Sequence, residues 1–323
     1  MAAAVAEMAV IIPSYGDPAG LFRALESLAA QQPLTDDLHG RSWPRQWSVQ
    51  VVHSGPIPLP PPSQWPQLPL HWRLSCVSPQ RLSAAQARNL AVRLCGAELL
   101  VFLDADCLAE PQFLASHLQA HQRGASVVSG PVLPGEGDTR VAQAEYLVEF
   151  ATTRLRRRGG AITAPACNVS IRRSVLEAVG GFPDLEAGED VLLHLRLRRR
   201  GHRLELHPTA SVRHSGRQRR HDYRRHRRFI GAGLGQLTAQ AEREGLFGSN
   251  VSPEYRMLRW ICRSPAGLLL VIAKLFRLLA LILQGDRLVL RLLPQTLLLV
   301  LEGLWLEAGA CHQAWRREQQ HLG

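Results

Sequence analysis

Two kinds of segment alternate through the first half of this chain. One kind is short and apolar at every position, and in the other the apolar residues recur at helical spacing. Residues 8–12 (MAVII) and 99–103 (LLVFL) are of the first kind, and residues 18–32 and 84–96 are of the second. A run that is apolar throughout is typical of a strand buried on both faces, as in a parallel sheet covered by helices. The alternation therefore predicts an α/β fold with a doubly wound sheet.

The pattern changes after residue 137. Residues 138–158 are predicted to form a long surface helix, and residues 159–173 a turn with short strands. Residues 189–201 are predicted to form a helix that ends at a glycine. The second half of the chain therefore departs from the regular alternation of the first.

The C-terminal part is rich in leucine, and residues 266–283 are about long enough to span a bilayer, for which ~20 apolar residues are needed. Five polar side chains in and after this stretch fall roughly on one helical face: Lys274, Arg277, Gln284, Arg287 and Arg291. We interpret the stretch as an amphipathic element that lies in the membrane plane or re-enters it, with a spanning helix and a buried helical bundle as alternatives. Residues 1–235 are thus predicted to form the α/β domain, and residues 236–323 a membrane-associated helical region.

The formal net charge is +11, and its excess is confined to one segment. Between Arg196 and Arg228 there are 13 arginines against two acidic residues. Such an excess suits an anionic partner, either a nucleic acid or a charged surface. The segment lacks the interleaved aromatics of single-strand binding platforms, and the chain has no zinc-finger or basic-zipper pattern. We therefore expect no nucleic-acid partner.

The compartment is indicated by the cysteines and the N-terminus. The six cysteines are scattered and form no C-x-x-C pair, which favours a reduced, cytosolic compartment. Residues 1–16 lack a basic beginning and a long apolar core, and Glu7 interrupts them. We therefore predict a strand there rather than a signal peptide.

Two carboxylates, Asp104 and Asp106, directly follow the apolar run at residues 99–103. In open α/β sheets, ligands bind beyond the carboxyl ends of the strands. Paired carboxylates at such a place offer hard oxygen ligands that suit Mg²⁺ or Mn²⁺ bridged to a diphosphate. The alternative is structural, with Asp106 starting a turn and Asp104 capping the helix that begins near Pro111.

The context of this pair is formed by four segments in a fixed order. They are VIIPSYGDP (10–18), SAAQARNLAVRLCGAELLVFLDADC (83–107), CNVSIRRSVLEAVGGF (167–182) and GEDVLLHLRLRRRGHRLELHPTASVRH (188–214). In order and spacing they resemble the family 2 glycosyltransferases with the GT-A fold, over residues 8–233. The resemblance implies a mixed, Rossmann-like sheet and an enzyme that uses a nucleotide-sugar donor.

The resemblance also implies which residues would bind the nucleotide-sugar donor. Pro13, Ser14 and Tyr15 would line the base and ribose, and Arg88 and Asn89 would reach the nucleotide or its phosphates. For Arg88 the alternative is a solvated position on a helix face.

The family usually has an acidic residue after the second strand, where it holds the nucleotide base, whereas this chain has His53. Recognition of uracil by a carboxylate is therefore not expected, and a different base or recognition by backbone groups is possible.

The metal would be bound by Asp106, with Asp104 contacting the ribose or the metal, and His214 either joins these ligands or is structural. The cofactor implied is Mg²⁺ or Mn²⁺, which would neutralise the charge that grows on the leaving diphosphate.

The second acidic pair, Glu189 and Asp190, begins a predicted helix. Acids are favoured by the dipole at any helix N-terminus, so a purely structural role is the alternative. By resemblance, Asp190 is the general base that deprotonates the acceptor hydroxyl, and Glu189 supports it or orients the acceptor. Four residues would form the acceptor side: Asn168, Gly180, Gly181 and Phe182.

The arginine-rich segment resembles a basic, aromatic motif that ends in glycine, with Phe229 as the aromatic residue. Five arginines can lie along one side of a helix there: Arg217, Arg220, Arg224, Arg227 and Arg228. An arginine fork binds phosphate bidentately, so the implied role, for Arg224 and Arg228 in particular, is to hold the donor diphosphate or a lipid phosphate. A solvated or membrane-facing basic surface is the alternative.

Together these features predict an inverting, metal-dependent glycosyltransferase at the cytoplasmic face of the membrane. Its acceptor would be lipid-linked or a polysaccharide. The alternative is a degenerate, non-catalytic member of the family that acts as a membrane scaffold. A basic nucleic-acid-binding protein is a further, less favoured alternative.

Overall fold

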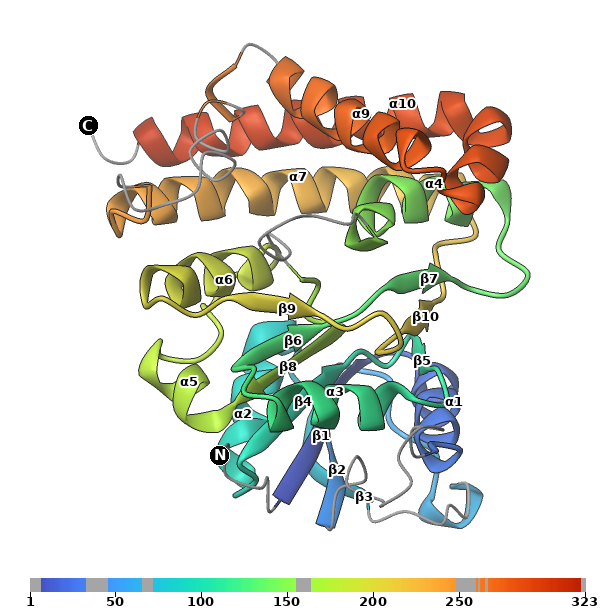
Figure 1. The fold of residues 1–323 in the computed structure, drawn as a ribbon, viewed down its shortest axis with the longest axis vertical. Coiled ribbons are helices and arrows are strands. Elements are labelled where there is room, and N and C mark those ends of the chain that lie inside the picture. Colours follow the sequence, from blue (N-terminus) through green and yellow to red (C-terminus); the bar gives the residue numbers. More distant parts are fainter. Residues whose placement is uncertain are drawn as a thin grey trace. The chain divides into compact units, whose positions relative to one another are not determined.

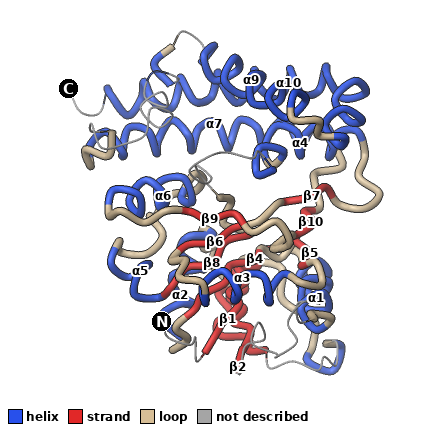
Figure 2. Tube along the Cα trace, in the orientation of Figure 1, coloured by secondary structure: helices blue, strands red, loops and turns tan. Residues whose placement is uncertain are grey.

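The structure is a computed structural model of the 323-residue chain that describes residues 7–32, 46–65, 72–154, 164–247, 260, 262–264 and 267–320. The chain forms two compact units (Figures 1 and 2). The sheet unit consists of Met1–Val132, Gly159–Asp184 and His202–His214. The helical unit consists of Leu133–Arg158, Leu185–Gly201 and Ser215–Gly323.

The sheet unit is built on a seven-stranded sheet in the order β3-β2-β1-β4-β8-β6-β9. Its strands are β1 (Glu7–Tyr15), β2 (Gln46–Ser54), β3 (Trp72–Ser78), β4 (Leu99–Leu103), β6 (Val127–Ser129), β8 (Asn168–Arg172) and β9 (Leu204–Leu206). β1, β2, β3 and β4 pair in parallel, whereas β8 is antiparallel to both of its neighbours. The predicted mixed α/β sheet is therefore confirmed.

A smaller sheet begins directly after the carboxylate pair. In it β5 (Cys107–Ala109) pairs antiparallel with β10 (Val212–His214). Its third strand is β7 (Val132–Pro134), through which the chain leaves the sheet unit. The largely apolar run at residues 125–135 thus divides between β6 and β7, which belong to different sheets.

Where the structure describes it, the sheet unit has four α-helices: α1 (Pro18–Ala29), α2 (Ala84–Leu94), α3 (Phe113–Gln122) and α5 (Arg173–Ala178). Local signals set where two of them begin. Asp17 accepts a hydrogen bond from the Gly20 amide at 2.9 Å, and Ser83 and Gln86 form a capping box. α2 packs against β1 and β2. Part of the proline-rich loop after β2, residues 66–71, lies outside the described residues.

The sheet core contains a buried polar network beside its apolar strands. His117 and His121 of α3 are completely buried, and the Ser170 hydroxyl lies 2.8 Å from a ring nitrogen of each. His117 also contacts the Asn168 amide oxygen at 3.1 Å. Burial lowers the pKa of His117 to about 3 and that of His121 to about 4, so both rings are neutral in the folded protein.

These histidines predict a loss of stability in mild acid. Because both pKa values are lower in the folded than in the unfolded chain, stability is full above about pH 6.5 and falls as the pH approaches 4. Each ring contributes a loss on the order of 2 kcal/mol by pH 5. Urea unfolding at pH 7.5 and pH 5 measures this. In the His117→Gln variant the loss between these two pH values should be smaller, and an unchanged difference would contradict the assignment.

The helical unit contains five α-helices among its described residues. They are α4 (Arg140–Glu149), α6 (Glu189–Arg199), α7 (Arg220–Arg243), α9 (Leu268–Leu283) and α10 (Arg287–Gln320). α4 is shorter than the helix predicted over residues 138–158. It is also more buried than a surface helix, because α10 packs against it. The predicted boundary between residues 235 and 236 falls inside α7.

α7 and α10 approach closely because glycines line their contact. A Cβ atom on Gly231 would lie 2.1 Å from the Glu307 carbonyl oxygen, and one on Gly235 would lie 2.4 Å from that of Cys311. On α10, a Cβ on Gly303 would overlap the Tyr223 hydroxyl. Larger side chains at these positions would therefore force the two helices apart.

Gly231→Ala should destabilise the helical unit by about 1–3 kcal/mol, because the added methyl group would meet backbone atoms that cannot move freely. Gly309→Ala is the matched control. It lies within α10 with nothing within 4 Å of its Cβ position, so alanine should leave stability equal or raise it by up to about 1 kcal/mol. Urea unfolding at pH 7.5 compares the two. Equal stability changes would show that the close helix contact is not required.

A chain of buried charges links four helices of this unit. Arg227 is fully buried and pairs with Glu149 and, at 3.3 Å, with Glu307. Lys274 reaches Glu307 at 2.5 Å. Lys274 therefore points into the helical unit, which corrects its predicted place on a cationic outer face of the segment. Burial lowers its pKa, although Glu307 opposes this shift.

The two C-terminal helices differ in length. α9 has 16 residues, fewer than the ~20 needed to cross a bilayer, and the following turn contains Gly285 at φ +74°. Among the described residues, α10 alone is long and apolar enough to cross a membrane, with a mean hydropathy of 1.5 over its most apolar window. One third of that window is buried within the protein. Length and composition give only weak support for a span, since core helices of soluble proteins meet the same criteria.

Candidate active site

The carboxyl ends of β1, β2 and β4 meet at one edge of the sheet, because the three strands are parallel. At this edge Ser14 lies opposite His53 in the β1–β2 register. The His53 ring is buried, with Nδ1 3.0 Å from the Ser14 hydroxyl and Nε2 2.8 Å from the Ile57 carbonyl oxygen. A carbonyl can only accept, so Nε2 carries a proton. Both ring nitrogens thus bind protein atoms and fix the loop after β2.

The residue next to Ser14, Tyr15, presents an exposed aromatic ring, 53% accessible, at the same edge. The Arg81 guanidinium lies 5.9 Å from the centre of this ring. Gly55 makes room for it, since a Cβ atom there would lie 2.5 Å from Tyr15 Cε2 and the residue has φ +101°. A ring held in this way offers a flat surface on which a nucleotide base can stack. Arg81 was not among the residues predicted from the sequence.

Arg88 is buried, which excludes the alternative of a solvated helix face. Its Nη2 atom lies 2.6 Å from Asp104 Oδ1, and its guanidinium lies 5.3 Å from the centre of the Phe182 ring. Asp104 remains 31% exposed. The helix-capping alternative for Asp104 is not observed either, because α3 has Gln112 at its N-cap. Arg88 therefore orients Asp104 at the carboxyl end of β4.

Asn89 fixes the loop that was predicted to face the acceptor. Its amide donates to the Phe182 carbonyl oxygen at 2.8 Å and accepts from the Phe182 amide at 2.9 Å. Gly181 passes so close that a Cβ atom there would lie 2.7 Å from Asn89 Oδ1, at φ +78°. Asn89, Gly181 and Phe182 are thus brought together by the fold.

Asn168 lies deeper in the same unit. It is fully buried, and its amide nitrogen donates to the carbonyl oxygens of Pro131 and Ala210 while its oxygen contacts His117. The amide thereby joins segments of the sheet unit that are far apart in sequence. Its predicted contact with an acceptor stays a prediction.

Asp106 lies next to His214. The ring nitrogen Nε2 and the carboxylate oxygen Oδ2 are 3.3 Å apart, and the Asp106 side chain is 46% exposed. This proximity follows from the strand register, which sets His214 opposite Cys107. Burial raises the pKa of the Cys107 thiol, which stays protonated and lies 3.7 Å from Asp106 Oδ1. The carboxylate and the imidazole, rather than the protonated thiol, therefore offer the ligand atoms here that a divalent cation accepts. Their role in binding a metal stays a prediction.

The second acidic pair begins α6 in the helical unit. Gly188 precedes it at φ +80°, and a Cβ atom on Gly188 would lie 2.3 Å from a methyl carbon of Leu237 in α7. Glu189 is largely buried, and Asp190 Oδ1 accepts a hydrogen bond from the Val191 amide at 2.7 Å. The packing against α7 fixes where this helix starts. The catalytic role of Asp190 stays a prediction.

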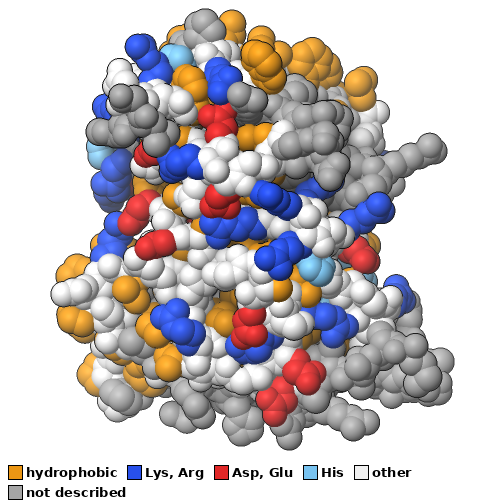
Figure 3. Space-filling view, turned by 90° about the vertical axis from the view of Figure 1, so that its left-hand side faces the viewer, with side chains coloured by type: hydrophobic (Ala, Val, Ile, Leu, Met, Phe, Trp, Pro, Cys, Tyr) orange, Lys and Arg blue, Asp and Glu red, His pale blue; other side chains and the backbone are white. Residues whose placement is uncertain are grey.

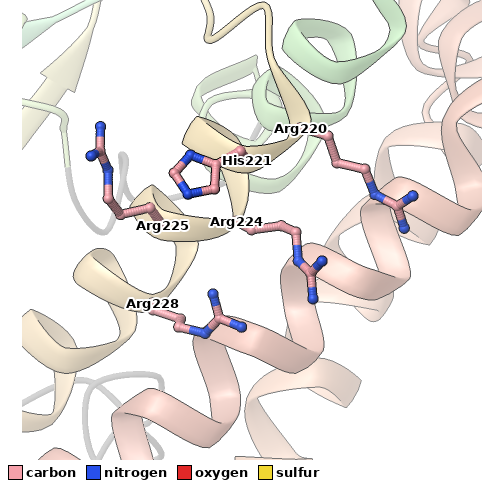
Figure 4. Close-up of a pocket in the computed structure, with 5 residues that line it drawn as sticks. All are labelled: Arg220, His221, Arg224, Arg225 and Arg228. Carbon is pink, nitrogen blue, oxygen red and sulfur yellow. The ribbon is translucent and has the colours of Figure 1, made fainter.

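The five arginines predicted on one helix side separate into two groups. Arg220, Arg224 and Arg228 line a pocket of about 550 Å³ with His221 and Arg225 (Figure 4). Arg220 and Arg224 both pair with a carboxylate oxygen of Glu302 in α10, at 2.9 Å and 3.2 Å respectively. Arg217 and Arg227 instead pair with Glu145 and Glu149 of α4. Arg217 lies before α7 begins and so does not share the predicted helix side, whereas Arg227 lies on α7 but is held by carboxylates instead of lining the pocket.

One further group has the composition of a metal site. The ligand atoms of Glu145, Glu149 and His226 lie within 4.8 Å of one another. Burial alone would raise the pKa of Glu149, but the charges of Arg227 and His226 hold it well below its usual range. Both carboxylates are thus already paired with arginine, and the group is an ion-pair network.

Comparison with known proteins places this site in a family. The family model described as "Glycosyltransferase like family 2" matches residues 68–230, which is half of the chain. The chain belongs to this family. As a family 2 member it carries Asp104, Asp106, Asn168, Glu189 and Asp190 within the matched region.

Two curated relatives are the pre-mycofactocin glycosyltransferases of Mycobacterium tuberculosis strains CDC 1551/Oshkosh and ATCC 25618/H37Rv. This family 2 chain is 28% identical to each over 172 residues. The match covers 50% of this chain and 36% of each relative, so the chain spans about a third of their length.

A similar solved structure is a mannosyltransferase from Pyrobaculum calidifontis in complex with GDP-Man and Mn²⁺. The TM-score is 0.58 at 19% identity, over 96% of this family 2 chain and 87% of that one. The likeness confirms the predicted GT-A fold.

Proposed function

We propose that this family 2 chain transfers a sugar, with inversion, from a nucleotide-diphosphate donor to a lipid-linked or polysaccharide hydroxyl. The observation that carries the proposal is the Asp106–His214 pair, 3.3 Å apart beyond the carboxyl end of β4, in which the Asp106 side chain is 46% exposed. Asp104, held by Arg88, follows the same strand.

The residues at this place suit Mg²⁺ or Mn²⁺. A carboxylate and an imidazole are ligand types that such ions accept, and adjacent ligands of an octahedral ion are roughly 3 Å apart. The distance between Asp106 and His214 is close to that value. With the cation bound, the negative charge that develops on the leaving diphosphate would be neutralised. The Mn²⁺ in the mannosyltransferase from Pyrobaculum calidifontis supports testing that ion first.

The protein side chains have separate tasks in this proposal. Tyr15 and Arg81 offer a stacking surface for the base, and Ser14, held by His53, lies beside them. Asp190 takes the proton from the acceptor hydroxyl as that oxygen attacks the anomeric carbon. Arg224 and Arg228 provide cationic donors for phosphate oxygens.

Calorimetry with GDP and UDP, in the presence of Mn²⁺ and then of a chelator, tests the donor site. We expect binding with Mn²⁺ and a loss of affinity of at least about tenfold with the chelator. Hydrolysis across a panel of nucleotide sugars then identifies the donor. The absence of both binding and hydrolysis would favour the non-catalytic scaffold.

A further inference from the structure

The helical unit has an outer face that is unusually apolar. On α9, five large side chains are exposed at positions that fall within an arc of about 80° on a helix of 3.6 residues per turn. They are Leu268, Ile272, Phe276, Leu279 and Leu283. Arg277 and Lys274 lie outside this arc, so the exposed face of α9 carries no charge.

α10 has a matching face. Its exposed residues Leu290, Leu297, Leu298, Leu301 and Trp305 fall within an arc of about 100°. Figure 3 shows apolar side chains gathered at the upper edge of the view, where these two helices lie in Figure 1. Contiguous apolar surface of this kind marks a binding face rather than ordinary solvent-exposed surface.

Arginines border this apolar face. Glu302 lies between Leu301 and Trp305 in sequence, and it pairs with Arg220 and Arg224 of α7. These two arginines belong to the pocket of Figure 4, in which Arg228 makes no ion pair with the described residues. Arg287 and Arg291 are also exposed, at the start of α10. The charge next to the apolar face is thus positive.

We infer that this apolar face and the arginine pocket of α7 dock the chain onto a bilayer that contains anionic phospholipids. α9 and α10 lie in the plane of the interface, and the pocket takes a headgroup phosphate. The inference deepens the predicted membrane association. Of the two phosphates proposed for Arg224 and Arg228, the donor diphosphate and a lipid phosphate, it assigns the lipid phosphate. Apolar burial supplies the attachment, and the arginines supply the preference for anionic lipid.

Vesicle flotation tests this with the full chain and liposomes of phosphatidylcholine, with and without phosphatidylglycerol at roughly 30%, which makes the surface anionic. We expect at least about tenfold stronger binding to the anionic vesicles at low salt, and a decrease as salt is raised. Leu279→Glu should reduce binding to the anionic vesicles at least about tenfold, since it introduces a charge into the apolar face.

Two variants complete the test. Leu94→Glu is the matched control, because Leu94 of the sheet unit is 46% exposed and Leu279 is 45% exposed. It should float like the unsubstituted chain. Arg228→Gln should lower the affinity for anionic vesicles about fivefold and leave that for neutral vesicles unchanged, as expected for one arginine at an anionic surface. Arg93→Gln, an exposed arginine of α2, should have no effect.

Three results would overturn the inference. The first is equal flotation of the Leu279→Glu and Leu94→Glu variants. The second is retention of the chain in vesicles after alkaline carbonate, which would indicate a spanning helix. The third is a dimer, measured by light scattering, that Leu279→Glu converts to monomers, because a second copy would then cover the apolar face.

Discussion

Asp106→Asn should transfer sugar at least about 10²-fold more slowly than the unsubstituted enzyme, because an amide is a poor ligand for the proposed Mg²⁺ or Mn²⁺. The fold should be retained. Asp106 is 46% exposed, and asparagine has nearly the same size and shape, so the replacement should leave the packing around it intact. Initial rates with the donor identified by hydrolysis, measured at several Mn²⁺ concentrations, check the effect.

Two further variants separate metal binding from fold stability. Asp104→Asn removes the charged partner of buried Arg88 and should lower the stability by about 2 kcal/mol, unlike Asp106→Asn. Glu177→Gln is the control for removing a surface carboxylate, since Glu177 is 59% exposed and pairs with a neighbouring arginine on its own helix. A wild-type rate and wild-type Mn²⁺ dependence for Asp106→Asn would contradict the proposed metal site.

Asp190→Asn should lower the rate of transfer about 10²- to 10⁴-fold while donor binding stays unchanged. An amide cannot accept the acceptor proton, whereas it can still accept the hydrogen bond from the Val191 amide. The measurements are the turnover rate and the donor affinity by calorimetry. The increase in rate with rising pH that reports deprotonation of a general base should also disappear in the variant.

The structural alternative for Asp190 makes the opposite prediction. If the carboxylate only stabilises the N-terminus of α6, Asp190→Asn should cost about 0.3–1 kcal/mol of stability and leave turnover near that of the unsubstituted enzyme. Thermal unfolding of the variant distinguishes the two. Near-normal turnover would show that the base assignment is wrong.

Local sequence patterns predicted the elements of the sheet unit well. The continuous run LLVFL became β4, buried at every position, and the residues SAAQ gave the capping box that begins α2. Such signals act within a few residues, so they can be recognised without the fold. The antiparallel direction of β8 was not recognised in this way, because a buried strand is apolar whichever way it runs.

The arginines show where sequence patterns were insufficient. Arg227 and Arg228 are neighbours, yet one is fully buried between two carboxylates and the other lines the pocket. The sequence did contain one sign that some arginines would be paired with acids: Glu302 and Glu307 of α10 interrupt a leucine-rich stretch. An acid in such a stretch indicates a buried cationic partner, but not which one.

The chain by itself determined the strand and helix segments, the family pattern and the position of each acidic pair, because these depend on residue order and local hydrogen bonds. Only the tertiary structure decided that Arg88 is held against Asp104, that His214 lies beside Asp106 and that Lys274 points inward. These contacts join residues 16 to more than 100 positions apart. A charged side chain is buried only where the packed fold supplies its partner, and that partner is set by the folding of distant segments together.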